Sequence, residues 1–532
     1  MRQADKLGGG WTRRRFLAAG GLLVVGGASA AVLAVEATAK GGGGGPSSAA
    51  SSGSPPPVAR RHYRSRTDLT AAQVAVAAPV GSVAPGLVFL TPNNGLAPDG
   101  LLIADNAGKP IWIRPDTGAN AANFRPAVYR GKPVLTWWEG SVNGGFGAGQ
   151  LVIMDDTYTE LLRFAAGAGR KADIHEFQIT PQGTALILTD SGVPLLPGGS
   201  PPPWQNWDCI VEEVDIATGA VLFEWHSADH ISPDESVIPA PGSTPSPSAT
   251  ANALAGTATA TATATPGASL AAPAIPVYDS VHANAIELDT DGNLIVSARN
   301  TSAIYKVDRS TGAIRWRLGG KRSDFKMGPG ATFALQHDPR RHPDGTLSVF
   351  DDGAAPSTSR AIFLDVDEVA MTANLVRAYP HPHAKLATSQ GNMQVLPNGN
   401  VFVGWGSTGY ASEFTSAGQL LFDADFSGSI QSYRCFRYPW TATPTTVPDL
   451  AVDPPSSGVV NAYASWNGAT EVASWEVLNG ASATTLASLG TSPRADFETT
   501  LAVKAASGYL AVNALDPKGS VLGTSAAVVI PE

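Results

Sequence analysis

The sequence contains few charged residues and few cysteines. Charged residues make up 15% of its 532 residues, and acidic residues outnumber basic ones by 45 to 36, whereas an ordinary soluble domain carries roughly 25% charge. The excess of negative charge argues against a protein that binds the phosphate backbone of nucleic acids. Two cysteines cannot build a disulfide scaffold or a Cys-based zinc site. Cys209 and Cys435 could pair outside the cytoplasm or stay buried as thiols, and the sequence leaves both open.

The N-terminal residues have the order of an export signal. Residues 1–39 contain Arg13-Arg14-Arg15, followed by an uncharged stretch that begins at Phe16, as in a secretory leader. Paired arginines before Phe-Leu are typical of a twin-arginine signal. Because about 20 apolar residues can cross a bilayer, the same stretch could remain as a membrane anchor. In both cases we expect the bulk of the chain outside the cytoplasm, secreted or attached to the outer face of the cytoplasmic membrane.

Two tracts lack the large apolar side chains that a packed core needs. Residues 40–82 begin with a run rich in Gly, Ser, Pro and Ala, and residues 239–273 contain Ala-Thr repeats. Such compositions cannot offset the entropy lost when a chain becomes ordered. We therefore expect a disordered linker over 40–82 and a disordered insertion over about 239–273, inside a folded domain.

Gly and Pro are abundant, with 57 and 41 residues, and many of them mark turns before short β-rich runs. Asn-Gly and Asp-Gly turns between apolar runs are strong hairpin signals. Four such turns recur along the chain, at Pro181-Gln182-Gly183, Asp291-Gly292-Asn293, Asp344-Gly345 and Asn398-Gly399-Asn400. The sequence therefore predicts repeated β-hairpins and an all-β fold.

A second motif, Asp, then Gly, then an apolar run ending in Trp, accompanies these turns. It runs from Val307 to Trp316, from Val214 to Trp225 and, more weakly, from Ala104 to Trp112. The later copies recur at roughly 50–60 residues, which is near the length of a propeller blade. Residues 83–440, without the insertion, would make about six blades, with seven possible, and each Trp would pack between neighbouring sheets.

The last part of the chain has a different sequence pattern. After Trp440 a Pro/Thr stretch leads into residues 445–532, where runs such as Ala473 to Val477 alternate apolar and polar residues. This pattern and length are typical of a small fibronectin-type-III or Ig-like β-sandwich. Such modules usually bind other molecules or act as spacers between domains, so we expect no catalytic role for residues 445–532.

Three of the nine histidines occupy equivalent positions. His175, His282 and His337 each stand some five to ten residues ahead of one of the glycine turns, on the first strand of the hairpin. In a propeller these strands surround the central axis, so the three imidazoles are expected to meet in one funnel. Arg299 ends the strand that follows His282 and could reach the same mouth. At a fourth equivalent position the chain has Gln390 instead.

An ordered set of motifs adds a family resemblance. In chain order they are His282-Ala283-Asn284, Val296-Ser297-Ala298-Arg299, Ile304 to Asp308, Trp316 to Gly320, Gln336-His337-Asp338 and Phe350-Asp351-Asp352-Gly353. Over roughly residues 83–440 this set resembles the arylsulfotransferase (arylsulfate sulfotransferase) family, and is closer to its actinobacterial and fungal branch. The last motif differs from the Asn-containing form of the family.

The resemblance implies a six-bladed β-propeller that moves a sulfuryl group from a phenolic sulfate to a phenol, without a nucleotide donor. It implies that His337 is the transiently sulfated nucleophile, that His175, His282 and Arg299 assist, and that Asn284 is a polar neighbour that binds substrate. A neutral imidazole suits the first role because its ordinary pKa is about 6.5. An arginine offers a planar fork to an oxyanion. His282 or His175 would protonate the departing phenolate and later deprotonate the acceptor.

Other functions stay open at this stage. Three histidines could bind zinc, but Arg299 beside them would disfavour a cation, so no metal or other cofactor is expected. The main alternative is a non-catalytic binding propeller at the cell envelope. A hydrolase or lyase using the same funnel is another. The expected partners are small phenols and aryl sulfates, and the oligomeric state is not specified by the sequence.

Overall fold

The computed structural model describes residues 60–77, 82–93, 100–115, 117–193, 204–243, 276–353, 357–426, 429–504 and 508–532. In these ranges the regular structure consists of strands β1 to β37 and four short 3-10 turns, η1 to η4, so the all-β prediction is confirmed. No helix among the described residues is long and apolar enough to span a bilayer. The predicted signal over 1–39 and most of the predicted insertion over 239–273 lie outside the described residues.

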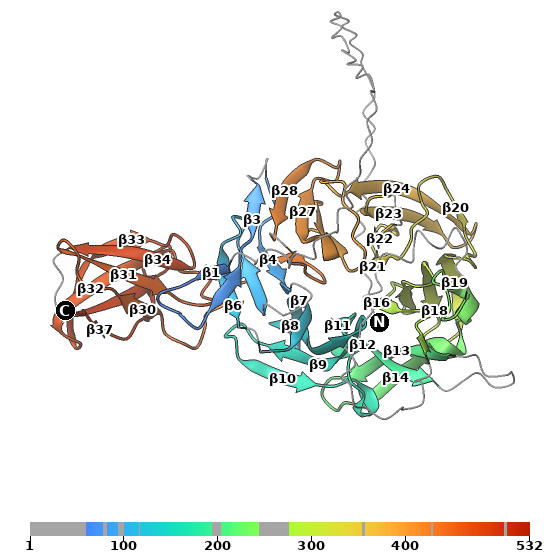
Figure 1. Ribbon diagram of the computed structural model, residues 1–532, viewed down its shortest axis with the longest axis horizontal. Coiled ribbons are helices and arrows are strands. Elements are labelled where there is room, and N and C mark those ends of the chain that lie inside the picture. The colour runs from blue at the N-terminus through green and yellow to red at the C-terminus, as the bar shows by residue number, and fades with distance from the viewer. Residues whose placement is uncertain are drawn as a thin grey trace, which may run out of the picture. The chain divides into compact units, whose positions relative to one another are not determined.

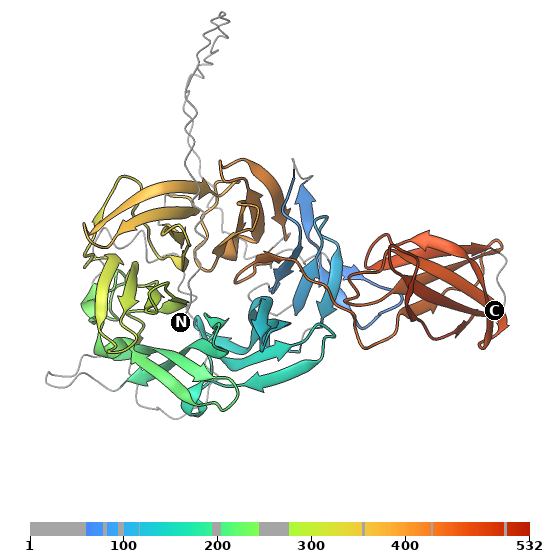
Figure 2. The ribbon, with the colours of Figure 1, turned by 180° about the vertical axis from the view of Figure 1, so that it is seen from behind.

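Six sheets of four or five strands surround a common centre (Figures 1 and 2), and all but two of their strand pairs are antiparallel. We number them 1 to 6 and give each from its inner strand outward. Sheet 1 is β29(Phe436–Tyr438), β4(Leu87–Leu90), β5(Leu101–Ala104) and β6(Pro110–Arg114). Sheet 2 is β7(Asn120–Tyr129), β8(Lys132–Asn143), β9(Phe146–Met154) and β10(Glu160–Phe164). Sheet 3 is β11(Phe177–Ile179), β12(Thr184–Val193), β13(Gln205–Asp215) and β14(Val221–His226), with β15(Val277–Tyr278) beside β13.

The other three sheets follow the same plan. Sheet 4 is β16(Ala283–Leu288), β17(Leu294–Ala298), β18(Ala303–Val307) and β19(Ile314–Gly319). Sheet 5 is β21(His337–Arg341), β22(Leu347–Asp351), β23(Arg360–Asp367), β24(Thr372–Pro380) and β20(Lys326–Met327). Sheet 6 is β25(Asn392–Val395), β26(Val401–Gly404), β27(Tyr410–Phe414), β28(Leu420–Asp425) and β3(Ala75–Ala77). The 3-10 turns are η1(Gly167–Gly169), η2(Ser227–Asp229), η3(Pro233–Glu235) and η4(Gly406–Thr408).

All four hairpin turns predicted from the sequence join an inner strand to the second strand of its sheet. Gly183, Gly292, Gly345 and Gly399 have φ between 82° and 86°, a conformation that glycine adopts without steric cost. These four inner strands therefore begin at one end of the ring's centre and finish, with their glycine turns, at the other.

The three repeated tryptophans pack between sheets, as predicted. Trp112, Trp225 and Trp316 are 5%, 2% and 3% exposed. Trp225 of sheet 3 shares a core with residues of sheet 4, and Trp316 of sheet 4 shares one with residues of sheet 5. The cores between neighbouring sheets are what hold adjacent repeats together.

The ring is closed by segments from distant parts of the chain. Inner strand β29 pairs with β4, and β3 pairs with the outer edge of β28. Residues 60–77 also contain β1(Arg60–His62) and β2(Thr70–Ala72), so the part of the predicted 40–82 linker that the structure describes is ordered. The prediction of disorder was wrong for this part because it rested on the many polar residues. Leu69, Ala71 and Ala72 are buried, and the arginines pair with acidic residues far away in the sequence.

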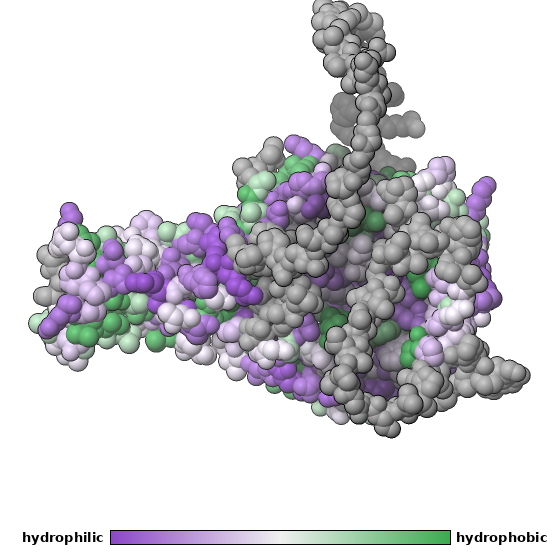
Figure 3. All heavy atoms as spheres, viewed as in Figure 1, coloured by the Kyte–Doolittle hydropathy of each residue, from purple (hydrophilic) through white to green (hydrophobic). Residues whose placement is uncertain are grey.

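The C-terminal region consists of two antiparallel sheets that enclose one core. The strands of the first are β30(Asp449–Val452), β31(Val459–Ser465) and β34(Glu498–Lys504). Those of the second are β33(Thr485–Pro493), β32(Ser474–Ser482), β35(Tyr509–Leu515) and β36(Val521–Thr524), with β37(Val528–Val529) beside β35. Trp466 and Trp475 lie in this core. Hydrophilic side chains gather where these sheets approach β1 (Figure 3), and Arg61–Asp496 and Arg64–Asp453 are ion pairs there.

Candidate active site

The three histidines picked out by the sequence lie together at the starting end of the inner strands. His175 precedes β11, His282 precedes β16, and His337 is the first residue of β21. The rings of His175 and His282 meet edge to face, with their centroids 4.7 Å apart. The Tyr433 ring lies 5.5 Å from His175 and 6.4 Å from His337. Imidazoles separated by up to 162 positions in the sequence therefore face one small space.

Irregular backbone turns these side chains toward the centre. The pairing of β16 with β17 shifts between Ala283 and Ala285, and that of β21 with β22 shifts between His337 and Arg340. His282 and Asp338 have φ of 53° and 52°, which non-glycine residues rarely adopt. Bulges of this kind redirect a side chain at the end of a strand. Backbone strain of this type often accompanies functional sites.

Each of the three histidines is held through Nδ1 by a carboxylate. His337 Nδ1 lies 2.6 Å from Asp352 Oδ2, and His282 Nδ1 lies 2.6 Å from Asp279 Oδ2. His175 Nδ1 contacts Asp173 Oδ1, and Asp173 also accepts the Gly147 backbone N–H at 2.6 Å. Such a contact fixes the tautomer and the ring orientation.

Buried surroundings keep His337 neutral. It is 1% exposed, and burial, followed by the charge of Arg299 and the other two histidines, lowers its pKa well below the usual value. Its Nε2 accepts the Gln390 backbone N–H at 3.2 Å, which puts the ring proton on Nδ1, toward Asp352. Burial raises the pKa of Asp352, and the charge of Arg299 opposes that rise. His337 thus carries its lone pair on Nε2.

Arg299 has a donor that is not used in the structure. Its Nη1 donates to Asn300 Oδ1 and its Nη2 to the Thr388 carbonyl, both at 2.9 Å. Its Nε is buried and has no partner among the described residues. Burial lowers the pKa of this guanidinium, with Asp352 and Asp279 acting in the opposite direction, but an arginine stays charged in proteins. A ligand oxygen could satisfy both the charge and the unused N–H.

Asn284 lies behind the histidines rather than among them. Its side chain is fully buried, and its Nδ2 donates to the Gln336 carbonyl at 2.8 Å. Its own carbonyl accepts Nη2 of Arg434 at 3.1 Å and the Tyr433 hydroxyl at 3.3 Å. Its Oδ1 has no partner among the described residues. These contacts favour a structural role for Asn284, holding the wall of the site.

A layer of buried charges closes the space below the histidines. Glu176 is fully buried and accepts Nη1 of Arg434 at 3.0 Å and Nη2 of Arg340 at 2.7 Å. Burial raises the pKa of Glu176, but the surrounding arginines overcome this and lower it to about 2. Arg340 also contacts Asp338 at 2.5 Å. This paired layer stands between the histidines and the far end of the ring.

Aromatic side chains form one flank of the site. The Phe146 ring lies 5.4 Å from His282 and 4.6 Å from Trp207. Both side chains are partly exposed. Such surfaces suit an aromatic ligand, because rings pack favourably against one another at these distances.

Neither the three carboxylates, nor Gln390 as a hydrogen-bond donor, nor the aromatic flank was predicted from the sequence. The acids had a local signal, since Asp173 and Asp279 stand two and three residues before His175 and His282. Asp352 lay in a motif noted for resemblance but given no role. Among the described residues no group of three or more His, Cys, Asp or Glu side chains is arranged to hold a metal ion. Cys209 and Cys435 are both buried free thiols.

Comparison with known families gives a match that covers the site. The model of the family described as Arylsulfotransferase (ASST) matches residues 125–427, more than half of the chain. The chain belongs to the arylsulfotransferase family. The matched range includes His175, His282, Asn284, Arg299 and His337, so the arylsulfotransferase domain contains every candidate residue. Membership implies arylsulfate sulfotransferase activity, with aryl sulfates and phenols as substrates.

Other comparisons add no closer relative. No curated protein matches this arylsulfotransferase. A protein of unknown function from Bacteroides caccae is 13% identical, with a TM-score of 0.37, over 66% of this chain and 99% of that chain. Virginiamycin B lyase from Staphylococcus aureus, crystallised as an inactive variant with quinupristin, is 8% identical, with a TM-score of 0.31, over 74% and 97%. At these TM-scores neither resemblance says what this arylsulfotransferase does.

Proposed function

We propose that this arylsulfotransferase moves a sulfuryl group from an aryl sulfate to a phenol through a covalent adduct on His337. The observation that carries the proposal is the state of His337: a neutral ring, oriented by Asp352, with its lone pair on Nε2 and the unused N–H of Arg299 nearby. A neutral imidazole is a competent nucleophile, and covalent capture splits one transfer into two easier steps.

In the first step Nε2 of His337 attacks sulfur. The N–S bond forms as the bond from sulfur to the phenolic oxygen breaks, and the electron pair leaves with the phenolate. Nδ1 keeps its proton, so the sulfated ring is positively charged and Asp352 stabilises it. Arg299 Nε donates to a sulfuryl oxygen, which needs a fixed donor. Because Nε2 accepts the Gln390 N–H in the ligand-free protein, the donor must displace that contact when it binds.

In the second step an acceptor phenol takes the sulfuryl group from His337. Its proton passes to a neighbouring imidazole, which protonates the leaving phenolate in the first step. His175 and His282 are both suited to this task, because each is oriented through Nδ1 and neither Nε2 has a hydrogen-bond partner among the described residues. The pair is 4.7 Å apart between ring centroids, so one proton could serve both. No nucleotide donor is needed.

The test is direct detection of the adduct. The full chain is mixed with 4-nitrophenyl sulfate, quenched within one turnover, digested, and analysed by mass spectrometry for a sulfuryl group on the His337 peptide. His337→Ala should show neither the adduct nor the burst of 4-nitrophenolate, while His342→Ala, a matched change outside the site, should show both. A full burst in His337→Ala would refute the covalent role.

The surrounding architecture fits this proposal. We propose that the six sheets are the blades of a six-bladed β-propeller, and that the C-terminal sheets are a sandwich of the fibronectin-type-III or Ig-like kind without a catalytic role. We also propose that the chain is exported, on the basis of Arg13-Arg14-Arg15 and the uncharged stretch that follows. Detection of the mature protein in the periplasmic or extracellular fraction would support export, and retention in the cytosol would contradict it.

A further inference from the structure

A pocket opens at the opposite end of the ring from the histidines. It has a volume of about 920 Å³ and is lined by the finishing ends of the inner strands and by the turns that follow them. None of the three site histidines, Arg299 or Asn284 is among its lining residues. An inner strand such as β16 rises about 3.3 Å per residue, so Glu287 in this pocket lies roughly 16 Å beyond His282. The paired layer around Glu176 separates the two.

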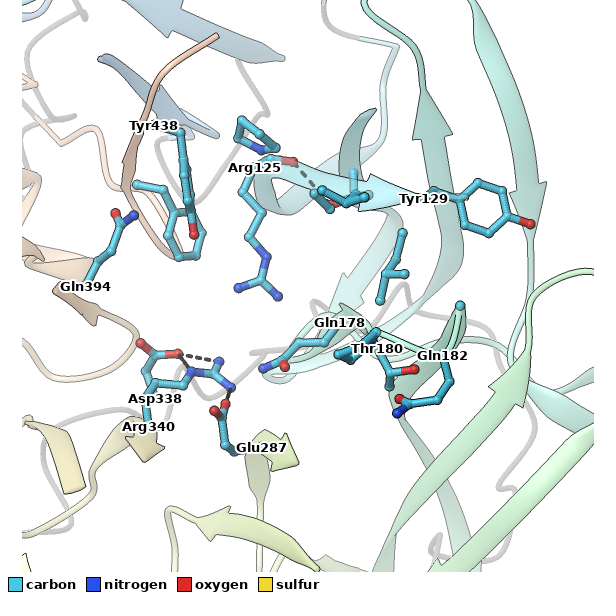
Figure 4. A pocket seen from close by; sticks show the side chains of 18 of the residues that line it. Arg125, Tyr129, Gln178, Thr180, Gln182, Glu287, Asp338, Arg340, Gln394 and Tyr438 are labelled. Carbon is cyan, nitrogen blue, oxygen red and sulfur yellow. Dashed lines mark hydrogen bonds and ion pairs between the residues drawn. The ribbon is translucent and has the colours of Figure 1, made fainter. Parts of the chain in front are cut away.

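The guanidinium of Arg125 points into this pocket (Figure 4). Its Nη2 donates to the Phe177 carbonyl at 2.8 Å. Its contact with a carboxylate is long, 3.5 Å to Glu176 Oε1, and that carboxylate is bound more closely by Arg434 and Arg340. No other hydrogen bond of the Arg125 guanidinium is present in the described part of the chain. Burial lowers the pKa of Arg125, and no carboxylate lies closer than 3.5 Å to offset the desolvation of this cation.

Two acids of the same pocket are already paired with an arginine. Glu287 Oε2 accepts Nη1 of Arg340 at 2.8 Å, and Asp338 is held by the same arginine. Gln394 is fixed to the backbone of Arg437 by two hydrogen bonds of 2.9 and 2.8 Å. The pocket therefore has firmly held walls and, in Arg125, a buried cation that lacks a close counter-charge.

Apolar and aromatic side chains share the lining with polar ones such as Gln178, Thr180 and Gln182. The Phe436 ring lies 5.2 Å from the Arg125 guanidinium carbon, and Tyr438 stands beside it (Figure 4). At the rim Val128 and Val395 are 65% and 40% exposed. A volume in the range of small-molecule sites, a buried arginine and an aromatic and apolar patch beside it fit a ligand with one anionic end and an apolar body.

We propose that this far pocket binds a small organic anion, whose carboxylate or similar oxyanion pairs with Arg125 and whose ring or short chain packs on Phe436, Tyr438 and the valine rim. This site is distinct from the sulfuryl-transfer site and does not depend on the function proposed for it. The bidentate fork of a guanidinium matches a carboxylate or phosphate, and such charge-assisted contacts are the strong ones.

The test uses the full chain with benzoate and phenylphosphonate as anionic probes and benzamide as the neutral control, measured by isothermal titration. Both anions should bind, and benzamide should bind at least tenfold more weakly. Arg125→Gln should weaken binding of the anions roughly 10- to 100-fold. Arg315→Gln, on the outer strand β19 and outside both sites, should leave it within twofold. Anion binding that is unchanged in Arg125→Gln would overturn the proposal.

Because Arg125 also contacts the buried layer, its substitution could disturb folding. A second pair of variants avoids this: Val128→Asp and Val128→Lys change an exposed rim position, where substitutions have small effects on stability. The aspartate should weaken benzoate binding and the lysine should strengthen it, each by severalfold. Equal binding in the two variants would refute an anion site here. So would the absence of binding of either anion at concentrations up to about 10 mM.

Discussion

Removing the charge of Asp352 is the sharpest test of how His337 works. In the proposed first step the ring becomes a sulfated cation with its proton on Nδ1, 2.6 Å from Asp352 Oδ2. Two unit charges about 4 Å apart interact by about 4 kcal/mol at an effective dielectric constant of about 20. Asp352→Asn keeps the shape but loses this interaction. Since the amide can still accept a hydrogen bond, we take about two thirds of that value as lost, which corresponds to roughly a 100-fold fall in rate.

The assay is a rapid-quench measurement of 4-nitrophenolate release in the first turnover, which reports sulfuryl transfer to the enzyme alone. Asp351→Asn is the matched control, because Asp351 is also buried but pairs with Arg360 at 2.8 Å and has no contact with His337. We expect a burst rate near wild type in Asp351→Asn and a rate about 100-fold lower in Asp352→Asn. If Asp352→Asn transfers sulfuryl groups within fivefold of the wild-type rate, the carboxylate does not stabilise the adduct and the reasoning fails.

Acidity, charge and packing can each be varied separately. Because burial lowers the pKa of His337, the burst rate should stay constant as pH falls below 6.5. The free energy of unfolding, measured with denaturant, should decrease over the same range, because His337 binds a proton in the unfolded state but not in the folded state. Arg299→Lys should lower the burst rate 10-fold or more with little change in melting temperature, because lysine cannot place a donor where Nε lies; an unchanged rate would exclude Arg299 from the reaction. Trp316→Ala should lower the free energy of unfolding by about 3–5 kcal/mol, because it empties the core between sheets 4 and 5; a loss below about 1 kcal/mol would contradict that packing. Asn467→Ala should lower it by about 1–3 kcal/mol, since it leaves the Ile113 N–H and carbonyl, which Asn467 now satisfies at 2.9 and 2.8 Å, without partners.

The repeat made much of the fold readable from the sequence. Each Gly turn, such as Asp291-Gly292, and each Trp, such as Trp316, belongs to a local pattern that recurs, and the structure has a hairpin or an inter-sheet core at each. The histidines were found by the same logic, because equivalent positions in a repeat take equivalent positions around the centre. His175 and His282 lie close together because they occupy equivalent positions on the inner strands of neighbouring sheets. No local feature of the sequence indicates this contact.

What the sequence did not reveal depends on contacts between distant residues. Nothing near Arg434 indicates that it will be fully buried against Glu176, 258 positions earlier. The Gln390 amide reaches His337 across 53 positions. Residues 60–77 were predicted to be part of a linker because many of them are polar. In the structure the Ser65 hydroxyl donates a hydrogen bond to Glu498, and β3 extends sheet 6. Composition cannot anticipate such pairings, since either partner alone resembles a solvated surface residue.

The way sheet 1 is completed has a consequence for biosynthesis. Its second strand, β4, is made early, but the inner strand that pairs with it, Phe436–Tyr438, is made more than three hundred residues later. Until the ribosome has released that segment, one side of β4 presents unpaired backbone groups, a surface that invites wrong partners. Chains that terminate before residue 436 should therefore aggregate rather than fold into a smaller ring, and the waiting nascent chain is a natural client for chaperones.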